Sequence, residues 1–249
     1  MCGIYGILLN CGTSYNIYSL ILNGLLQLQN RGYDSAGLSV IDKESIEVHK
    51  FASVGSEDAI YKLQQLNLMS DTISVGIGHN RWATHGIKND LNAHPHLSNN
   101  RKFSLVHNGI IENYNEIKQK LVKEGFIFNS QTDTEVVMKA YVEWGTDCLK
   151  KFNGMFAFAL YDPRNQLVFL ARDRAGEKPL FLFNNGEELR FASELKALLT
   201  DESLARKLDH ESMDIYLAMG YIPGDRCILK GFSKLKAAHA MTFDIKLGK

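Results

Sequence analysis

The second residue of the chain is a cysteine that directly follows the initiator methionine. If Met1 is removed, which the small Cys2 side chain permits, the thiol lies beside its own α-amine. An α-amine has a pKa of about 7.7–8.0, so it can accept a proton near neutral pH, and N-terminal nucleophiles use their own amine in this way. Cys2 is therefore a candidate nucleophile, although its position alone is equally compatible with a small buried side chain.

Three other positions could complete a site for an amino acid that carries an amide. Acyl transfer from an amide requires donors for the oxyanion, and Asn108-Gly109 offers a side-chain amide and a flexible backbone N–H. Arg81 could bind a carboxylate through two hydrogen bonds, and Asp133 could bind an ammonium group. Taken singly, these residues are also explained by an Asn-Gly turn, a surface ion pair and a helix cap.

The hydrophobic pattern predicts the elements that position these residues. Residues 3–9 form an apolar run typical of a buried strand, so Cys2 begins a core strand, and residues 103–107 form a strand that ends at Asn108-Gly109. The stretch from 80 to 100 has little periodicity, and a loop of that length in a compact domain is usually functional. Further strands are expected at 37–41, 45–50 and 73–79, and helices at 17–28, 57–66 and 116–124. A further helix is expected after a capping box at Thr132–Glu135, with an apolar face from Val136 to Trp144.

The second half of the chain has a different pattern. Short apolar runs at 155–161, 166–172, 180–183 and 189–192, separated by turn residues, predict an antiparallel meander. Helices at 193–199 and 210–220 and a strand-like tail complete the chain. Strands and helices do not alternate as βαβ units would, so we expect an α+β fold with antiparallel sheets flanked by helices.

Composition excludes several classes of protein. Lys+Arg and Asp+Glu are both 28, so no global positive field exists to attract nucleic acid or an anionic membrane. The start, MCGIYGILLN, lacks a positive segment and is not a signal peptide, and no stretch approaches the roughly 20 apolar residues of a membrane span. Four cysteines without a CxxC pair suggest neither a disulfide framework nor a zinc site, so a cytoplasmic protein is expected; they are Cys2, Cys11, Cys148 and Cys227.

Five of the eight histidines lie between residues 79 and 107. A cluster of this kind raises the question of a metal site. No pair has the spacing of zinc ligands on a helix, and the two rings of His94-Pro95-His96 lie along an extended segment. We therefore expect no metal site in this chain.

Five sequence blocks resemble the class II glutamine amidotransferases, which are N-terminal-nucleophile hydrolases. They occur in the order found in that family, which is more specific than any one block, and they are MCGIYGI, RGYDSAG (31–37), HNRWATHG (79–86), HNGIIENY (107–114) and QTDTEV (131–136). The resemblance implies a four-layer αββα sandwich of two antiparallel sheets flanked by helices. It also implies that Cys2 attacks the side-chain amide of L-glutamine to form a glutamyl thioester, with Asn108 and the Gly109 N–H as the oxyanion hole.

The resemblance also implies a set of substrate-binding residues. Arg81 corresponds to the residue that binds the α-carboxylate of glutamine, and Asp133 to the one that binds its α-amine. Thr84 and His85 lie on the loop that closes over glutamine in the family. Trp82 resembles a residue that helps to gate the path of ammonia.

The two halves of the chain resemble different members of the family. The first half is similar to glucosamine-phosphate synthase, and the second half is similar to asparagine synthetase at 152–162, 171–180, 191–199 and 221–235. We expect an amidotransferase domain at 1–205, followed at 206–249 by a linker and the start of an asparagine-synthetase-like region whose synthetase domain is missing. The phosphate-binding loops of ATP-using enzymes are absent from the sequence, so no cofactor is expected here, and ATP and Mg²⁺ only in the missing domain.

The expected function is hydrolysis of L-glutamine to L-glutamate and ammonia, which a synthase of the asparagine-synthetase type would use. The expected partner is a synthetase domain or a partner subunit, and a homodimer is compatible with this interpretation. Two alternatives stay open: the glutaminase half of a glucosamine-phosphate synthase, and a non-catalytic module that docks on a synthetase and regulates it.

Overall fold

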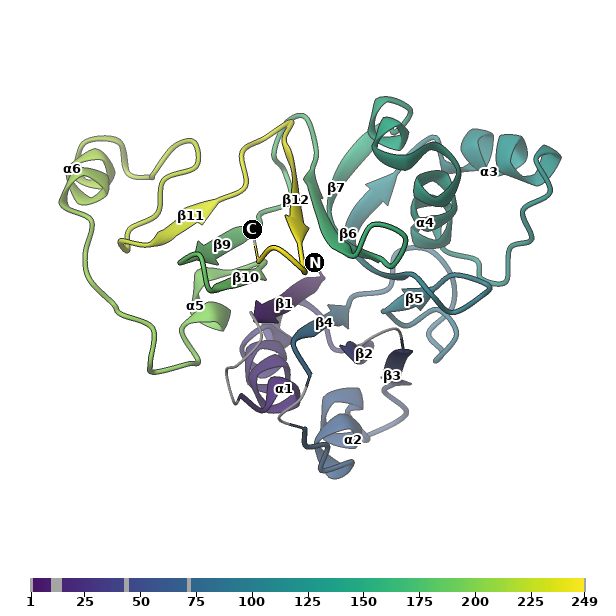
Figure 1. Cartoon of the computed structure of the whole chain (residues 1–249), viewed down its shortest axis with the longest axis horizontal. Coiled ribbons are helices and arrows are strands. Elements are labelled where there is room, and N and C mark those ends of the chain that lie inside the picture. The colour runs from purple at the N-terminus through teal and green to yellow at the C-terminus, as the bar shows by residue number, and fades with distance from the viewer. Residues whose placement is uncertain (1, 10–14, 43–44, 71–72, 249) are drawn as a thin grey trace.

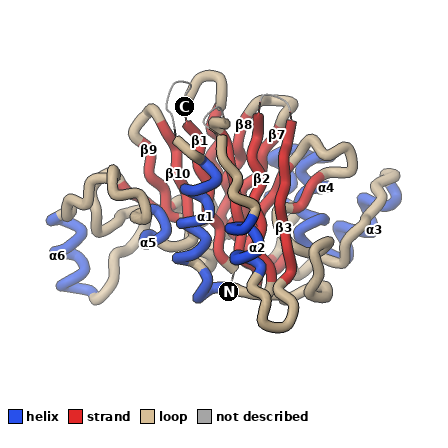
Figure 2. The backbone as a smooth tube through the Cα atoms, turned by 90° about the horizontal axis from the view of Figure 1, so that it is seen from below, coloured by secondary structure: helices blue, strands red, loops and turns tan. Residues whose placement is uncertain are grey.

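A computed structural model describes residues 2–9, 15–42, 45–70 and 73–248. Two antiparallel sheets pack face to face, and helices cover their outer surfaces (Figures 1 and 2). The predicted four-layer α+β class is therefore confirmed. Met1 and Cys11 lie outside the described residues.

The larger sheet has seven strands and contains the N-terminal strand near its centre. Because β1 has neighbours on both sides, the start of the chain is held within the sheet. Across the sheet the order is β11 (Phe232–Lys234), β9 (Phe181–Asn184), β10 (Glu188–Ala192), β1 (Gly3–Leu9), β4 (Val75–Arg81), β2 (Ser35–Asp42) and β3 (Ser45–Ala52).

The smaller sheet has five strands and lies against the larger one. Its order is β12 (Ala240–Asp244), β8 (Leu167–Arg172), β7 (Gly154–Asp162), β6 (Ser104–Ile111) and β5 (His96–Leu97). The larger sheet therefore takes its strands from residues 3–81 and 181–234, and the smaller one from residues 96–172 and 240–244.

The helices divide between the two outer faces. The larger sheet is covered by α1 (Ile17–Gln27), α2 (Ala59–Gln65) and α5 (Leu195–Leu198), and the smaller one by α3 (Tyr114–Lys123) and α4 (Asp133–Trp144). Helix α6 (His210–Met219) projects from the body beside β11 (Figure 1). Among the described residues, no helix has the length and apolarity needed to span a bilayer.

The alternation of side chains along β1 explains why the layers stack. Ile4 and Leu8 belong to the apolar cluster between the two sheets, whereas Tyr5 and Ile7 face the cluster formed with α1. Successive strand residues point to opposite faces, so a strand that is apolar at every position needs a partner layer on both sides. The uninterrupted apolar run at residues 3–9, which predicted a buried strand, therefore packs against apolar side chains on both faces of the sheet.

Two details of the sequence prediction are wrong. Strand β6 does not end at Asn108-Gly109 but continues to Ile111, because both residues stay in the ladder with β7. The second half is not one meander: β7 pairs with β8 in the small sheet, and β9 pairs with β10 in the large one. Asp173 redirects the chain between the sheets, since its buried carboxylate accepts backbone N–H groups of Phe156, Glu177 and Lys178.

Two local predictions can be compared directly with the structure. The predicted capping box at the start of α4 is half right: Thr132 Oγ1 accepts from the N–H of Glu135 at 3.4 Å, but the Glu135 carboxylate accepts from the N–H groups of Asn129 and Ser130, and the N–H of Thr132 donates to Ser130 Oγ. The helix expected at 193–199 is shorter, Leu195–Leu198. The expected domain boundary between residues 205 and 206 stays a prediction, and β11 and β12 beyond it add an edge strand to each sheet.

Candidate active site

The Cys2 thiol lies against the backbone that follows β4. Its Sγ is 3.3 Å from the nitrogen of Trp82, which donates to it, and 3.4 Å from the carbonyl oxygen of the same residue. Burial raises the pKa of the Cys2 thiol, and the positive charges of Arg81 and Arg31 act in the opposite direction. Little thiolate therefore forms near neutral pH unless a base takes the thiol proton. The α-amine of Cys2 is the base that we expect.

Arg31 fixes the backbone of Cys2. Its Nε donates to the carbonyl oxygen of Cys2 at 2.7 Å, and its Nη1 forms an ion pair with Glu194 at 2.9 Å. The Arg31 side chain is only 7% exposed, so the guanidinium needs both acceptors. Arg31 thus links the residue that precedes β1 to the N-cap residue of α5.

Asn108 and Gly109 belong to β6 and lie beside Cys2. The Asn108 Nδ2 donates to the carbonyl oxygen of Cys2 at 3.0 Å. Gly109 has a φ of +128°, and a Cβ at this position would overlap the carbonyl oxygen of Met155 on the neighbouring strand. Only glycine therefore allows β6 to keep this close approach, and Gly109 lines the same cavity as Cys2.

A cavity of about 220 Å³ opens at the thiol. This is smaller than the ~300–1,000 Å³ of pockets for drug-sized ligands, so it suits a small metabolite. The cavity brings together five of the eight predicted site residues, and it is lined by Cys2, Arg31, Trp82, Thr84, Asn108, Gly109, Ile110, Met155 and Lys178.

The other three predicted residues, Arg81, His85 and Asp133, do not line this cavity. The buried guanidinium of Arg81 donates to the carbonyl oxygens of residues 85, 86 and 87, so it holds the loop after β4. Asp133 accepts the N–H of Ile111 at 2.9 Å, at the end of β6. Burial lowers the pKa of Arg81, and the negative charges of Asp34 and Asp133 oppose this shift. Their roles toward substrate stay predictions.

The loop after β4 is also tied to the turn before β2. Asp34 accepts the N–H of Ala83 at 2.9 Å, and the Tyr33 and Trp82 rings meet edge to face at 5.6 Å. His85 packs edge to face on Tyr114 at 5.3 Å, at the start of α3. Trp82 is 45% exposed and Tyr33 58%, so an aromatic pair lies exposed at the mouth of the cavity.

Four of the clustered histidines are buried behind the site. His79 stacks on His94 with ring centroids 4.0 Å apart, and His94 meets His96 edge to face at 4.8 Å. Burial lowers the pKa of His79 to about 3 and lowers those of His94, His96 and His107. In the part of the chain that the structure describes, no group of three or more potential ligands is arranged to hold a metal ion.

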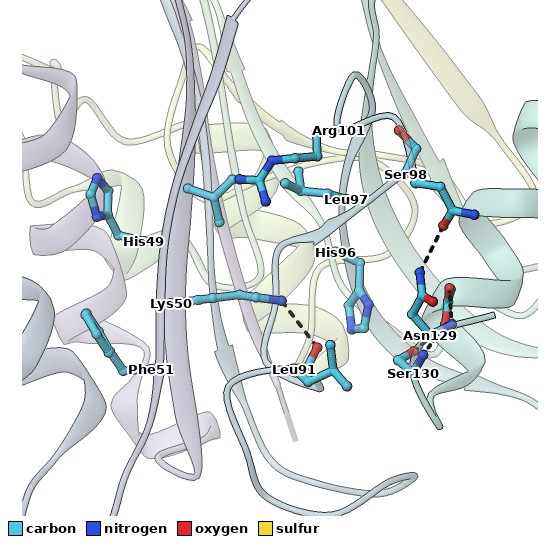
Figure 3. A pocket seen from close by; sticks show the side chains of 13 residues that line it. His49, Lys50, Phe51, Leu91, His96, Leu97, Ser98, Arg101, Asn129 and Ser130 are labelled. Atoms are coloured by element: carbon cyan, nitrogen blue, oxygen red, sulfur yellow. Dashed lines mark hydrogen bonds between the residues drawn. The ribbon is translucent and has the colours of Figure 1, made fainter. Parts of the chain in front are cut away.

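A larger cavity of about 540 Å³ lies between β3 and the loop that leads to β5 (Figure 3). Lys50 extends from β3 and donates to the carbonyl oxygens of Leu91, Ala93 and Pro95, at distances of 3.3, 2.7 and 3.2 Å. An ammonium group has three N–H donors, so these bonds use all of them. The amine of Lys50 therefore shapes the loop, and none of the predicted site residues lines this cavity.

Sequence reasoning missed several residues of the site. Arg31 contacts Cys2 although it is far from it in sequence, and Lys178 and Met155 line the cavity from the other half of the chain. Ser193 and His79 both bond the Asn108 side chain. The signal for Arg31 and His79 was their place in the RGYDSAG and HNRWATHG blocks, and the signal for Ser193 was its place in the stretch 191–199 that resembles asparagine synthetase.

Comparison with known proteins agrees with this geometry. A family model described as "Glutamine amidotransferase domain" matches residues 64–247. A glutamine–fructose-6-phosphate aminotransferase (isomerizing) of Pyrococcus horikoshii is 35% identical over 256 aligned positions, which cover 99% of this chain and 41% of that protein. The corresponding protein of Fusobacterium nucleatum is 41% identical over 168 positions, 64% of this chain and 26% of the relative.

A further relative is named as an asparagine synthetase and not as a sugar-phosphate aminotransferase. "Putative asparagine synthetase (glutamine-hydrolyzing) 2" of Methanocaldococcus jannaschii is 40% identical over 143 positions, 57% of this chain and 27% of that protein. This chain therefore spans well under half the length of the curated relatives described here.

Among solved structures, the fold is similar to that of the glutamine phosphoribosylpyrophosphate amidotransferase from B. subtilis. The TM-score is 0.68, the sequence identity is 24%, and the match covers 98% of this chain and 49% of the other. At that identity the likeness establishes the fold alone.

Proposed function

We propose, from the premise that this chain belongs to the glutamine amidotransferase domain family, that it hydrolyses L-glutamine to L-glutamate and ammonia through Cys2. The observation that carries the proposal is the meeting of the Cys2 thiol, the Asn108 amide and Gly109 in one small cavity. Acyl transfer from an amide needs a nucleophile and oxyanion donors, together with a base, for which the α-amine of Cys2 is proposed.

The chemistry runs in two halves. The α-amine of Cys2 takes the thiol proton, and the thiolate attacks the side-chain carbonyl carbon of glutamine. The negative oxygen of the tetrahedral intermediate accepts hydrogen bonds from Asn108 Nδ2 and the Gly109 N–H. As the C–N bond breaks, the amine returns the proton to the leaving nitrogen, which departs as NH3. Water then attacks the glutamyl thioester, and the thiol and glutamate are released.

Binding of the rest of glutamine is proposed to involve the loop after β4. Arg81 provides a guanidinium at the base of this loop, and Asp133 provides a carboxylate near the end of β6. Arg81 is bonded to carbonyl oxygens of residues 85–87, so its binding of the glutamine carboxylate would involve a movement of this loop, whereas Asp133 is bonded to the N–H of Ile111 on β6. Thr84 already lines the cavity, and Trp82 lies at its mouth, where it could limit the escape of ammonia.

For the ammonia acceptor, we propose a synthase of the asparagine-synthetase type, in a partner subunit or a following domain. The support is the resemblance of the second half of the chain and the similarity to the M. jannaschii protein. A sugar-phosphate aminotransferase is the second candidate, because the P. horikoshii and F. nucleatum relatives carry that name. Adding aspartate with ATP, or fructose 6-phosphate, with the matching domain distinguishes the two by which product forms.

A direct assay tests glutaminase activity. Purified chain is incubated with glutamine, and glutamate and ammonia are measured for the wild type and for Cys2→Ala. We expect release from the wild type and loss of at least several orders of magnitude in the variant. If both proteins are equally inert with either synthase domain present, the proposal is contradicted and the docking-module alternative is favoured.

A further inference from the structure

The side-chain amide of Asn108 is held at both ends by residues distant in sequence. Its Oδ1 lies 3.0 Å from Nε2 of His79, and its Nδ2 donates to Oγ of Ser193 at 2.8 Å. His79 comes from β4, and Ser193 directly follows β10. All three side chains are buried, so these hydrogen bonds are exchanged with water only at a large cost.

The neighbours of His79 determine which of its nitrogens carries the proton. Nε2 faces two acceptors, Asn108 Oδ1 at 3.0 Å and the carbonyl oxygen of His107 at 3.1 Å. Nε2 must therefore carry a hydrogen, and the neutral ring leaves Nδ1 bare. Nδ1 has no hydrogen-bond partner among the described residues, and burial keeps the ring neutral. His79 is thus a fixed donor to Asn108.

The other end of the amide faces acceptors. Ser193 Oγ accepts from the N–H of Ile4 as well as from Asn108, at 2.8 Å in each case. The carbonyl oxygen of Cys2 is the second acceptor of Nδ2. Rotation of the amide by 180° would place NH2 against the His79 donor and an oxygen against the Cys2 carbonyl, so this rotamer is excluded.

The His79 ring itself is held from the side. It stacks on His94 at an interplanar angle of 17°. His94 is in turn fixed through both ring nitrogens, since Nδ1 accepts the N–H of His107 at 3.2 Å and Nε2 lies 3.3 Å from Thr134 Oγ1. The buried histidines therefore form a rigid support that ends at the Asn108 amide.

We propose that His79 and Ser193 are positioning residues that orient the Asn108 amide: Ser193 Oγ holds one Nδ2 hydrogen, and the other is directed at Cys2, where it passes from the Cys2 carbonyl oxygen to the developing oxyanion. The proposal rests on the proposed function, because it requires Asn108 to act as an oxyanion donor. Donors that are oriented before the reaction need no reorganisation as charge develops, and one such donor is worth about 100- to 1,000-fold in kcat. The orientation affects the transition state and leaves the binding of glutamine unchanged.

Paired variants of His79 test the role of its N–H. His79→Leu removes the donor, whereas the side-chain amide of His79→Gln can place an N–H near the former Nε2. We expect His79→Leu to lower kcat about 10- to 100-fold with KM unchanged, and His79→Gln to recover most of the loss. Ser193→Ala should lower kcat in the same way, without affecting KM. Thermal midpoints are measured for each variant.

A double-mutant cycle with Asn108→Ala separates positioning from general damage. Because His79 acts through Asn108, adding His79→Leu to Asn108→Ala should lower kcat no further. The inference is overturned if His79→Leu costs the same factor in both backgrounds, or if His79→Gln is as slow as His79→Leu while both are folded. If Cys2→Ala releases glutamate as fast as the wild type, the proposed function fails instead, and the two failures are distinguishable.

Discussion

The guanidinium of Arg31 donates to the carbonyl oxygen of Cys2 at 2.7 Å and pairs with Glu194 on the other side. In the proposed function Cys2 acts as the first residue, and this contact would then give it a defined position without a preceding residue. The main-chain carbonyl is anchored by Arg31 and Asn108, and the strand that follows is central in its sheet. The thiol and the amine are then oriented by the rest of the molecule.

Arg31→Lys should therefore slow the reaction more than it destabilises the fold. A lysine can keep the ion pair with Glu194 but cannot donate to Cys2 and Glu194 with the geometry of a guanidinium. We expect kcat to fall about 10- to 100-fold, since small misplacement of a reacting group has effects of that size. Lys196→Met is the matched control: Lys196 also pairs with Glu194, at 3.1 Å, but does not line the cavity. Equal activity of the two variants would contradict the anchoring role.

Gly109→Ala should be much more damaging than Gly125→Ala. Both glycines have positive φ, +128° and +92°, but only at Gly109 would the new Cβ overlap a carbonyl oxygen, that of Met155. The backbone strain alone costs about 1–3 kcal/mol, and the overlap adds a shift of β6 away from β7. Urea unfolding and glutamate release give the comparison. If the two variants lose the same stability and the same activity, close packing of β6 at the site is not required.

The buried histidines should make the protein sensitive to acid. Burial lowers the pKa of His79 to about 3, whereas the unfolded chain has the ordinary value of about 6.5. Between these values the unfolded state binds more protons, so stability is complete above about pH 6.5 and is lost as pH falls toward 3. At pH 5 the loss from His79 alone is about 2 kcal/mol.

Urea midpoints at pH 7 and pH 5 measure this loss. His79→Gln should reduce the difference between the two pH values, because it removes one group that titrates only on unfolding. His210→Gln, on the exposed surface of α6, should leave the difference as in the wild type. An unchanged pH dependence in His79→Gln would show that His79 is not held neutral in the fold.

Residues before Cys2 should abolish activity. The thiol pKa is raised by burial, so the reaction depends on a nearby base, and the free α-amine of Cys2 is the proposed one. A chain carrying a cleavable N-terminal peptide should be inactive, and cleavage that leaves Cys2 first should restore glutamate release. The uncleaved protein serves as its own control for folding. Full activity before cleavage would exclude the amine as the base.

The layers of the fold could be predicted from the sequence because apolar runs and helical periodicity report burial directly. The apolar run 3–9 predicted β1, and the periodic residues from Ile17 predicted α1. The continuation of β6 through Asn108-Gly109 could not be predicted, since that dipeptide also favours a turn and only pairing with β7 decides the outcome. The split of the second half between two sheets depends on the carboxylate of Asp173 and was equally hidden.

The candidate site was predictable where its residues fall in recognisable blocks. Cys2, Trp82, Thr84, Asn108 and Gly109 line one cavity, whereas Arg81, His85 and Asp133 do not, and the roles of all eight residues stay predictions. Ser193 and Lys178 lie in the stretches 191–199 and 171–180, which resemble asparagine synthetase, but their place at the site depends on contacts with distant residues. Ser193 bonds Asn108 and Ile4, which lie 85 and 189 positions away from it in the sequence. Such contacts are set by the order of the strands in the sheets and cannot be predicted from neighbouring residues.

The central claim is that Cys2 forms a covalent intermediate with glutamine, and mass spectrometry of acid-quenched protein tests it most directly. During turnover, the N-terminal peptide should begin at Cys2 and carry an added glutamyl group through sulfur. The adduct should disappear when glutamine is exhausted and should be absent from Cys2→Ala. Glutamate release by Cys2→Ala at the wild-type rate, or a glutamyl adduct on another residue, would contradict the account.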